Sequence, residues 1–314
     1  MRYLLLLLLA SVVLKSFSQN TVATVDRLPA VVSGNFKRFE NFQSKYVEVR
    51  NVDVWLPEGY SNKKKYPVLY MQDGQMLFDS TTTWNHKDWK VDNVAAKLIS
   101  ENKVRPFIVV GIWNIGNKRH IEYFPQKAFE SMPAERQDSL FKASRKNGHS
   151  VFFTDKIISD DYLKFVVTEV KPFIDKTFSV LPGQQNTFIA GSSMGGLISL
   201  YAMCEYPSVF GGAACISTHW PGIFSTENNP LPDAIFSYLK THLPSPQTHK
   251  LYFDYGTETL DALYAPLQQK ADEIIKSKGY STTNWITKEF KGADHSETSW
   301  QQRLHIPLEF LFSK

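Results

Sequence analysis

A serine between glycines is the residue of this sequence that is best placed to do chemistry. Ser193 stands in the segment GSSMGG, which follows one apolar run, NTFIA, and precedes another, LISLYAM. A serine in the pattern G-x-S-x-G marks a sharp turn from a strand into a helix, and the turn holds its hydroxyl clear of the sheet as a nucleophile. The positive N-terminal end of the helix favours negative charge at the same point. The sequence therefore predicts Ser193 as the nucleophile of an acyl-transfer reaction.

A nucleophilic serine needs a general base, and a histidine follows the last predicted strand. In hydrolases with this turn, the order along the chain is serine, acid, histidine. Residues 285–290 form the last predicted strand, and His295 follows it in the segment KGADHS. His305, the other histidine beyond that strand, lies in a predicted closing helix, where we expect it to pack. His295 is therefore the predicted base.

The third member of such a triad is an acid that orients the histidine and stabilises its charged form. It belongs after the preceding strand, LYFDYG, where the segment GTETLD supplies Glu258 and Asp261. Asp254 lies inside the strand and is less free to reach a histidine. Glu258, two residues past Gly256, is the predicted acid. Asp261 is the alternative, although its place before a predicted helix also suits an N-cap.

An acyl-transfer site also needs two backbone N–H groups that bind the developing oxyanion. The first comes from the residue after the nucleophile, which is Met194 here. The second comes from a loop after an early strand, and the segment YMQDGQ supplies such a loop. Because Gly74 allows close approach of the backbone, the amide of Gln75 is the predicted second donor.

The segments around these residues alternate between strands and helices. We predict an early strand or hairpin at 45–56 and further strands at 67–71, 106–112, 187–190, 210–216, 250–255 and 285–290. Helices are predicted at 91–99, 160–178, 194–205, 262–278 and 303–312. Such alternation gives the α/β class, a mostly parallel central sheet covered by helices on both faces. We predict one domain over residues 20–314.

One long polar segment, 117–154, breaks the alternation. Connections of this length inside a compact domain usually have a function or are mobile. We interpret the segment as an insertion above the active site, and a surface excursion without a role is the alternative. Its polar residues Arg119, Glu122 and Tyr123 are the candidates for substrate contacts.

The N-terminus indicates export. Residues 1–19 have a basic start, a short apolar run and small residues near the end, which is typical of a secretory signal peptide. The apolar run is too short to span a bilayer comfortably, although an uncleaved anchor is the alternative. We expect a secreted or periplasmic protein with no stable membrane insertion after cleavage.

The composition argues against several other classes of protein. Lys and Arg total 35 against 31 Asp and Glu, and this near balance points to no nucleic acid or other polyanion as partner. Cys204 and Cys215 are predicted as free buried thiols, with a disulfide as the alternative in an exported protein. No Cys/His cluster has metal-ligand spacing, so we expect neither a metal nor a cofactor.

These motifs resemble the esterase family that contains esterase D, ferric enterobactin esterases and feruloyl or acetyl-xylan esterases. The resemblance runs from about Phe39 to the C-terminus and rests on VDVWLPEGY, YPVLYMQDGQMLFD, FIVVGIWNIGNKRHIEYFP, FIAGSSMGGLISLYAMCEYPSVFGGAACIS and GADHSETSW. It implies an α/β-hydrolase fold, with Ser193 as nucleophile, His295 of the G-x-x-H-x-x-x-x-W stretch as base, and the DGQ segment in the oxyanion hole. The sequence departs from the family at Thr259, where relatives often carry the acid, and some relatives work with a Ser–His pair alone.

The predicted function is the hydrolysis of carboxylic esters through an acyl-enzyme. Ser193 attacks the ester carbonyl while His295 takes its proton, and His295 then protonates the leaving alcohol and activates water. The candidate substrates are small-molecule or carbohydrate esters, namely acylated polysaccharides and siderophore lactones. Two alternatives stay open: an acyltransferase with a sugar as acceptor, and a non-catalytic binding module on a hydrolase scaffold.

Overall fold

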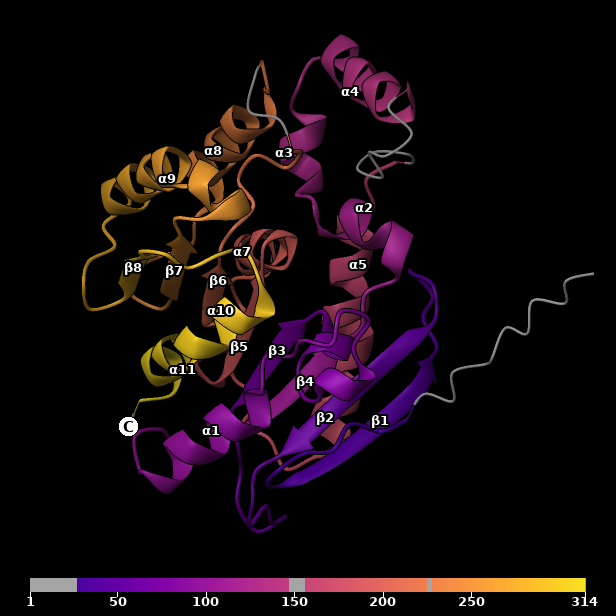
Figure 1. Cartoon of the computed structure of the whole chain (residues 1–314), viewed down its shortest axis with the longest axis vertical. Helices are drawn as coiled ribbons and strands as arrows, with labels where there is room; N and C mark the ends of the chain where they lie inside the picture. The colour runs from indigo at the N-terminus through magenta and orange to yellow at the C-terminus, as the bar shows by residue number, and fades with distance from the viewer. Residues whose placement is uncertain (1–26, 147–155, 225–227, 314) are drawn as a thin grey trace, which may run out of the picture.

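An eight-stranded sheet forms the centre of the structure, a computed structural model that describes residues 27–146, 156–224 and 228–313 (Figure 1). Its strands are β1 (Asn35–Phe42), β2 (Arg50–Leu56), β3 (Val68–Gln72), β4 (Ile108–Ile112), β5 (Thr187–Ser192), β6 (Gly212–Ile216), β7 (Lys250–Gly256) and β8 (Trp285–Phe290). They lie in the order β1-β2-β4-β3-β5-β6-β7-β8. β2 pairs antiparallel with β1 and β4, and all the other pairs are parallel. This mostly parallel sheet is that of an α/β-hydrolase, as the sequence predicts.

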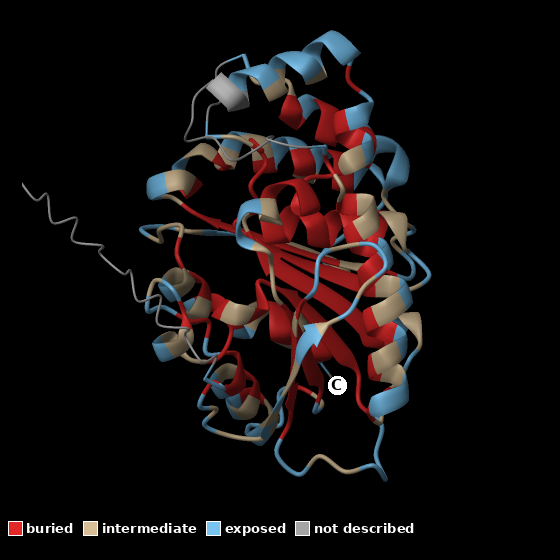
Figure 2. Cartoon of the chain, turned by 90° about the vertical axis from the view of Figure 1, so that its right-hand side faces the viewer, coloured by how far each residue is buried: buried red, intermediate tan, exposed pale blue. Residues whose placement is uncertain are grey.

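Helices cover both faces of the sheet, and Figure 2 shows its strands buried between them. They are α1 (Val91–Ser100), α2 (Arg119–Tyr123), α3 (Gln126–Glu130), α4 (Ala134–Lys146), α5 (Ser159–Phe165), α6 (Lys171–Thr177), α7 (Met194–Glu205), α8 (Leu231–His242), α9 (Ala265–Ser277), α10 (Glu297–Arg303) and α11 (His305–Phe312). Successive side chains of a strand point to opposite faces, so neighbours in sequence enter different cores. Tyr70 packs in the core that contains α5 to α9, whereas Leu69 packs in the core that contains α1, α10 and α11.

Most predicted elements are present, and the differences have physical causes. The helix predicted at 160–178 contains a π-helical turn, Val166–Val170, between α5 and α6. The closing helix predicted at 303–312 is α11, and a further helix that the sequence analysis did not predict, α10, precedes it and ends next to Leu304. β1 lies at the edge of the sheet and is half-exposed, so it has no continuous apolar run that the sequence patterns could reveal.

The long polar segment interpreted as an insertion above the active site is helical over its first part. It contains a short 3-10 turn, η3 (Gly116–Lys118), followed by α2, α3 and α4, and its residues 147–155 lie outside the described ranges. Ile121 of α2, Phe124 between the two helices and Phe129 of α3 are all buried in the core that contains α5, α7 and α8. The apolar residues of this segment therefore tie α2 and α3 to the body of the protein, so the segment is not polar throughout.

The C-terminal ends of the parallel strands carry the residues that the sequence singles out. These ends meet at one edge of a parallel sheet, where ligands of α/β proteins bind. The polar residues found just after β3, β4, β5, β6, β7 and β8 are Asp73, Asn114, Ser193, Ser217, Asp261 and His295, respectively. The sheet therefore brings residues from distant parts of the sequence to one place.

The remaining predictions concern the N-terminus and the cysteines. The predicted signal peptide, residues 1–19, lies outside the described residues. Within the described ranges, no helix combines the length and the apolar character needed to cross a membrane. Cys204 and Cys215 are free and buried, as predicted, and burial raises the pKa of both thiols, which makes them inert packing groups.

Candidate active site

Ser193 has the strained backbone of a nucleophile elbow. It lies between β5 and α7 with φ 57° and ψ −122°, a combination that residues with a side chain rarely adopt. The turn is so tight that a Cβ atom on Gly191 would lie 2.7 Å from the carbonyl carbon of Gly195. The Ser193 N–H donates to the carbonyl of Ile216 at 2.9 Å, which ties the turn to β6. The hydroxyl is therefore held at the start of α7.

His295 is paired with Asp261. The Nδ1 atom of His295 lies 2.5 Å from Oδ1 of Asp261, whose side chain is fully buried. The His295 N–H also donates to Oγ1 of Thr259 at 2.9 Å, so the loop after β7 holds both the backbone and the ring of the histidine. A carboxylate on Nδ1 fixes the tautomer in which Nε2 can act as a base.

The predicted first choice for the acid, Glu258, is corrected to Asp261. Glu258 is exposed and accepts a hydrogen bond from the neighbouring Thr257 hydroxyl, whereas Thr259 adopts φ 53° and begins a 3-10 turn, η7 (Thr259–Leu263). This turn carries Asp261 back to the end of β7. Asp261 is not the N-cap of α9, because that helix begins only at Ala265.

Hydrogen bonds decide the charge of Asp261. Burial opposes its ionisation, but the hydrogen bond and the charge of His295, the Ser217 hydroxyl at 2.5 Å and the Gly256 N–H at 2.6 Å outweigh burial and lower the pKa of Asp261. The carboxylate is therefore ionised at neutral pH and can stabilise a positive charge that forms on His295.

Two residues that sequence reasoning missed, His219 and Tyr264, lie next to the elbow. His219 Nδ1 is 2.8 Å from the Tyr264 hydroxyl, and the His219 N–H donates to the carbonyl of Ser193 at 3.2 Å. Burial, and then the charges of His295 and Arg119, lower the pKa of His219 to about 3, so it stays neutral. Its place shortly after β6, at the same sheet edge as Ser193, is the signal that could have revealed it.

The loop after β3 forms another wall of the site. Asp73 adopts the left-handed conformation, with φ 56°, and precedes a 3-10 turn, η1 (Gly74–Met76). Gly74 is required there because a Cβ atom would lie 2.6 Å from the carbonyl carbon of Gly111 in β4. This close packing brings Gln75 to the cleft described below. Met194, the other predicted oxyanion donor, is the first residue of α7.

Arg119 holds Asp73 by a two-pronged ion pair. Its Nε and Nη2 atoms each lie 2.7 Å from a different carboxylate oxygen, and Asn114 Nδ2 donates to the same carboxylate at 2.7 Å. Burial would lower the pKa of Arg119, but the neighbouring charge of Asp73 outweighs burial and raises it. The Arg119 side chain remains 27% exposed and lines the cleft, so its charge is within reach of a bound molecule.

A cleft of about 420 Å³ joins these groups. Besides Ser193 and His295, its walls include the aromatic residues Trp84, Trp89 and Trp300 and the polar residues Asn114, Arg119 and Glu297. Among the hydrogen bonds of the described residues, none joins the side chains of Ser193 and His295, although both face this space. Catalytic hydrogen bonds often tighten only in the substrate complex. The cleft can therefore hold a carbonyl group between the nucleophile and the base.

Two of the predicted substrate contacts, Glu122 and Tyr123, are not in the cleft. Glu122 is fully buried and pairs with Arg50, with oxygen–nitrogen distances of 2.6 and 2.8 Å. Tyr123 is also fully buried; its hydroxyl accepts a hydrogen bond from the Asp73 N–H at 3.4 Å, and its ring lies 5.2 Å from that of Tyr162. Both residues face the interior side of α2, so their role is structural, and that prediction was wrong.

Comparison with known proteins assigns the family. The family model described as "Putative esterase" matches residues 46–310. The chain belongs to this esterase family. An endo-1,4-beta-xylanase/feruloyl esterase from Xylanibacter ruminicola is 22% identical over 89% of this chain and 31% of its own length. A ferulic acid esterase structure has a TM-score of 0.62 at 18% identity, covering 89% of this chain and 98% of that one. The enterobactin esterase FES from Shigella flexneri has a TM-score of 0.62 at 16% identity, covering 90% and 60% of the two chains.

The family and the site geometry agree on the chemistry of this esterase. Membership makes the protein a carboxylic ester hydrolase, and the resemblance noted from the sequence motifs is confirmed. Over the described part of the chain, no three His, Cys, Asp or Glu side chains gather in a way that could hold a metal ion. At the ends of the strands, Ser193 and His295 line one cleft, and Asp261 is bonded to His295.

Proposed function

We propose that this esterase hydrolyses its substrates through an acyl-enzyme on Ser193. His295 removes the proton from the Ser193 hydroxyl as its oxygen attacks the ester carbonyl, and the amides of Met194 and Gln75 bind the oxyanion. His295 then gives the proton to the leaving alcohol. Water, deprotonated by the same histidine, releases the acid and restores the serine. Asp261 stabilises the positive charge that His295 carries in both steps.

The main support for this proposal is that the strained Ser193 and the carboxylate-bound His295 line the same cleft. The strain at Ser193 costs about 1–3 kcal/mol, which a merely structural turn would not need. The 2.5 Å contact between His295 and the buried Asp261 gives the imidazole a fixed tautomer. Together with the esterase family, these features favour nucleophilic catalysis over a water attack assisted by a base alone.

Replacement of the serine tests the proposal. Ser193→Ala should lower kcat for p-nitrophenyl butyrate on the order of a millionfold and abolish covalent labelling by a fluorophosphonate, seen as a mass shift. Ser199→Ala is the matched control, because Ser199 is buried in the same helix and its hydroxyl only donates to the backbone of Gly195. A folded Ser193→Ala variant that keeps its activity or its label would refute the mechanism.

The walls of the cleft favour acylated carbohydrates as the substrate class. Trp84 is 81% exposed and lines the cleft, beyond the Trp89–Trp300 pair, whose rings lie 5.4 Å apart. The negative face of an indole attracts the C–H bonds of a sugar ring, while polar groups such as Arg119 and Asn114 can bind its hydroxyls. A relative that joins a feruloyl esterase to an endo-1,4-beta-xylanase agrees with this choice over a siderophore lactone. A carbohydrate substrate also agrees with export, which we propose from the signal-peptide pattern of residues 1–19.

The exposed tryptophan gives a direct test of substrate class. Trp84→Ala should raise KM for feruloylated oligosaccharides roughly tenfold and leave kcat/KM for p-nitrophenyl acetate within a factor of about two. Tyr46→Ala, at an exposed aromatic residue that does not line the cleft, should change neither value. If enterobactin-type trilactones are hydrolysed faster than any sugar ester, the carbohydrate assignment is wrong while the serine mechanism stands.

A further inference from the structure

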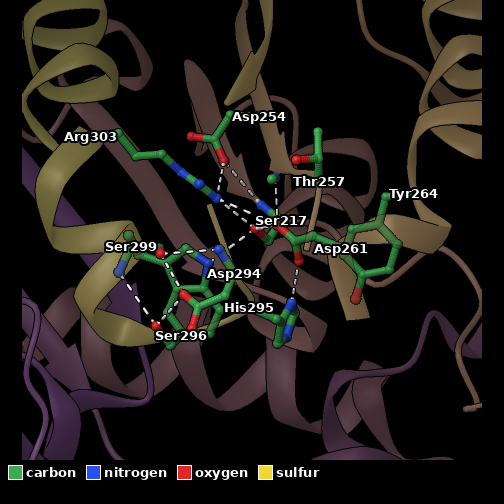
Figure 3. Close-up of polar contacts among 12 residues, drawn as sticks. Ser217, Asp254, Thr257, Asp261, Tyr264, Asp294, His295, Ser296, Ser299 and Arg303 are labelled. Carbon is green, nitrogen blue, oxygen red and sulfur yellow. Dashed lines mark hydrogen bonds and ion pairs between the residues drawn. The ribbon is translucent and has the colours of Figure 1, made fainter. Parts of the chain in front are cut away.

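A buried hydroxyl, that of Ser217, lies directly behind Asp261 (Figure 3). Ser217 follows β6, is fully buried, and takes a left-handed backbone with φ 43°. Its Oγ atom lies 2.5 Å from Asp261 Oδ2, 3.0 Å from Trp300 Nε1 and 2.7 Å from Arg303 Nη2. One hydroxyl thus connects the acid next to His295 with two residues of α10.

The partners of this hydroxyl fix the direction of its hydrogen bonds. A serine hydroxyl has one proton to donate and two lone pairs that accept. The Trp300 indole and the Arg303 guanidinium can only donate, so they occupy both lone pairs. The single proton of Ser217 therefore points to Asp261 and has no competing acceptor among these contacts. The Gly256 N–H donates to the same carboxylate oxygen, Oδ2, and Oδ1 is left for His295.

Arg303 adds a positive charge to the same arrangement. Its Nη2 atom lies 3.0 Å from Asp254 Oδ1 and 3.7 Å from Asp261 Oδ2, so one buried cation serves two buried carboxylates. In the described part of the chain, its Nε and Nη1 atoms are buried without a hydrogen-bond partner. A buried guanidinium that uses a single nitrogen is costly for stability, and such costs are expected where a residue is kept for function.

We propose that Ser217 and Arg303 are positioning residues that aim Asp261 at His295 and keep its carboxylate ionised. The inference rests on the proposed serine mechanism, in which Asp261 must be an anion. The ionisable groups that interact with Asp261 are His295, Arg303, Asp254, His219 and Tyr264. His219 is neutral and Tyr264 is held protonated by burial, so Arg303 and Asp254 set the balance of charge on the inner side of the Asp261–His295 pair. On the outer side, Arg119 and Glu297 line the same cleft as His295, and the variants below leave both in place.

This arrangement predicts the direction in which the pH dependence of activity shifts when each of these groups is removed. The active form of the enzyme has an ionised Asp261 and a neutral His295, and the uptake of one proton by this pair ends activity on the acid side. Groups that stabilise the anion, namely the Ser217 hydroxyl and Arg303, oppose that uptake. The negative charge of Asp254 favours it. The acid limb is the low-pH side of the activity profile, where activity falls as this proton is taken up. Loss of the Ser217 hydroxyl or of Arg303 must move the acid limb to higher pH, and loss of the Asp254 charge must move it to lower pH.

The experiment measures kcat/KM against pH for full-length variants with a p-nitrophenyl ester. Ser217→Ala should lower kcat/KM roughly tenfold and move the acid limb up by about one pH unit, because a hydrogen bond to an ionised group is lost. Asp254→Asn should move the limb in the opposite direction. Ser199→Ala, at a buried serine bonded only to the backbone, should leave the limb in place.

The outcomes separate this inference from the mechanism on which it rests. A lower rate in Ser217→Ala without a shift of the acid limb would mean a merely structural role and would overturn the proposal. If Ser217→Ala does not fold, Asp254→Asn decides alone, because an unmoved limb or an upward shift contradicts the proposed balance of charge. Activity retained in Ser193→Ala would instead refute the serine mechanism itself, whatever the pH profiles show.

Discussion

Replacing Asp261 by asparagine would disable this esterase by reversing a tautomer. In the structure, Asp261 Oδ2 accepts hydrogen bonds from the Ser217 hydroxyl and the Gly256 N–H, and Oδ1 accepts from His295 Nδ1. An asparagine at this position has only one oxygen, and two donors already require that oxygen on the inner side. Its NH₂ group must therefore face His295 and donate to Nδ1. The histidine then carries its proton on Nε2 and cannot accept one from Ser193.

The expected fall in kcat follows from two losses, the negative charge of Asp261 and the correct tautomer of His295. A unit charge about 4 Å from the imidazolium is worth about 4 kcal/mol at the effective dielectric of a protein surface, or nearly three powers of ten in rate. The wrong tautomer raises the cost further, and the same change in serine proteases lowers kcat about 10⁴-fold. We therefore expect Asp261→Asn to lower kcat by 10³- to 10⁴-fold, with KM nearly unchanged. The assay is steady-state hydrolysis of p-nitrophenyl butyrate at neutral pH.

The control is Glu258→Gln, because Glu258 lies on the same loop but is exposed. It should keep wild-type kcat. A fall of less than tenfold in Asp261→Asn would mean that Ser193 and His295 work as a pair without an acid. An inactive Glu258→Gln variant together with an active Asp261→Asn variant would show that the loop after β7 rearranges in solution. The reasoning from the 2.5 Å contact between His295 and Asp261 would then be wrong.

Further predictions concern stability, pH and metals. Arg50→Met should lower the free energy of unfolding by about 3–5 kcal/mol in urea titrations, because it leaves the fully buried Glu122 without its partner. Burial raises the pKa of Asp254 to about 6, above its value in the unfolded chain, so its ionisation opposes folding. Between about pH 4 and 6 its contribution should lower the unfolding free energy by up to ~3 kcal/mol as pH rises, and unfolding curves of Asp254→Asn should lack that slope. EDTA should leave ester hydrolysis unchanged, and a loss of rate that zinc restores would contradict the metal-free mechanism.

The sequence could predict where Ser193 and His295 lie in the fold, because a local turn pattern marks the first and the order of the elements marks the second. The pattern around Ser193 needs glycines within a few residues, and apolar runs mark the strand before it and the helix after it. β8 and α7 were predicted with the boundaries that the structure has. Since chain order fixes which strand precedes the histidine, His295 follows from the order of the elements alone.

The identity of the acid could not be read in the same way. Glu258 and Asp261 are three residues apart on one loop, and the choice depends on the path of the backbone between them. Thr259 takes a left-handed conformation, with φ 53°, that threonine rarely adopts. The sequence pattern gives no sign of this turn, because its cost is offset by long-range contacts: the Thr259 hydroxyl accepts from the His295 N–H, and Asp261 is held by Ser217. Those contacts join residues far apart in the sequence.

Glu122 and Tyr123 of α2 were predicted to contact substrate, but both are buried. Glu122 and Tyr123 are polar residues in a segment rich in charge, and the sequence suggests solvent or substrate as their environment. In the structure, Arg50 neutralises Glu122 inside the core, an ion pair between residues 72 positions apart. Only Arg119, one turn earlier on the helix, faces the cleft. A polar residue in a helix can face either way, and its partner must be known before its role can be assigned.

Four of the residues that build the site have a strained backbone. Asp73, Ser193, Ser217 and Thr259 all have positive φ, and they follow the parallel strands β3, β5, β6 and β7. At roughly 1–3 kcal/mol each, their combined strain is comparable to the whole net stability of a typical domain. Such conformations persist only when the surrounding packing determines them. Here β3, β5 and β6 are fully buried, and β7 is buried at every residue after Lys250. The sheet therefore supplies the rigidity that lets neighbouring loops hold the proposed nucleophile, acid and oxyanion loop in strained positions at one edge. This edge, and not the sequence of any single loop, brings Ser193, Asp261 and His295 together.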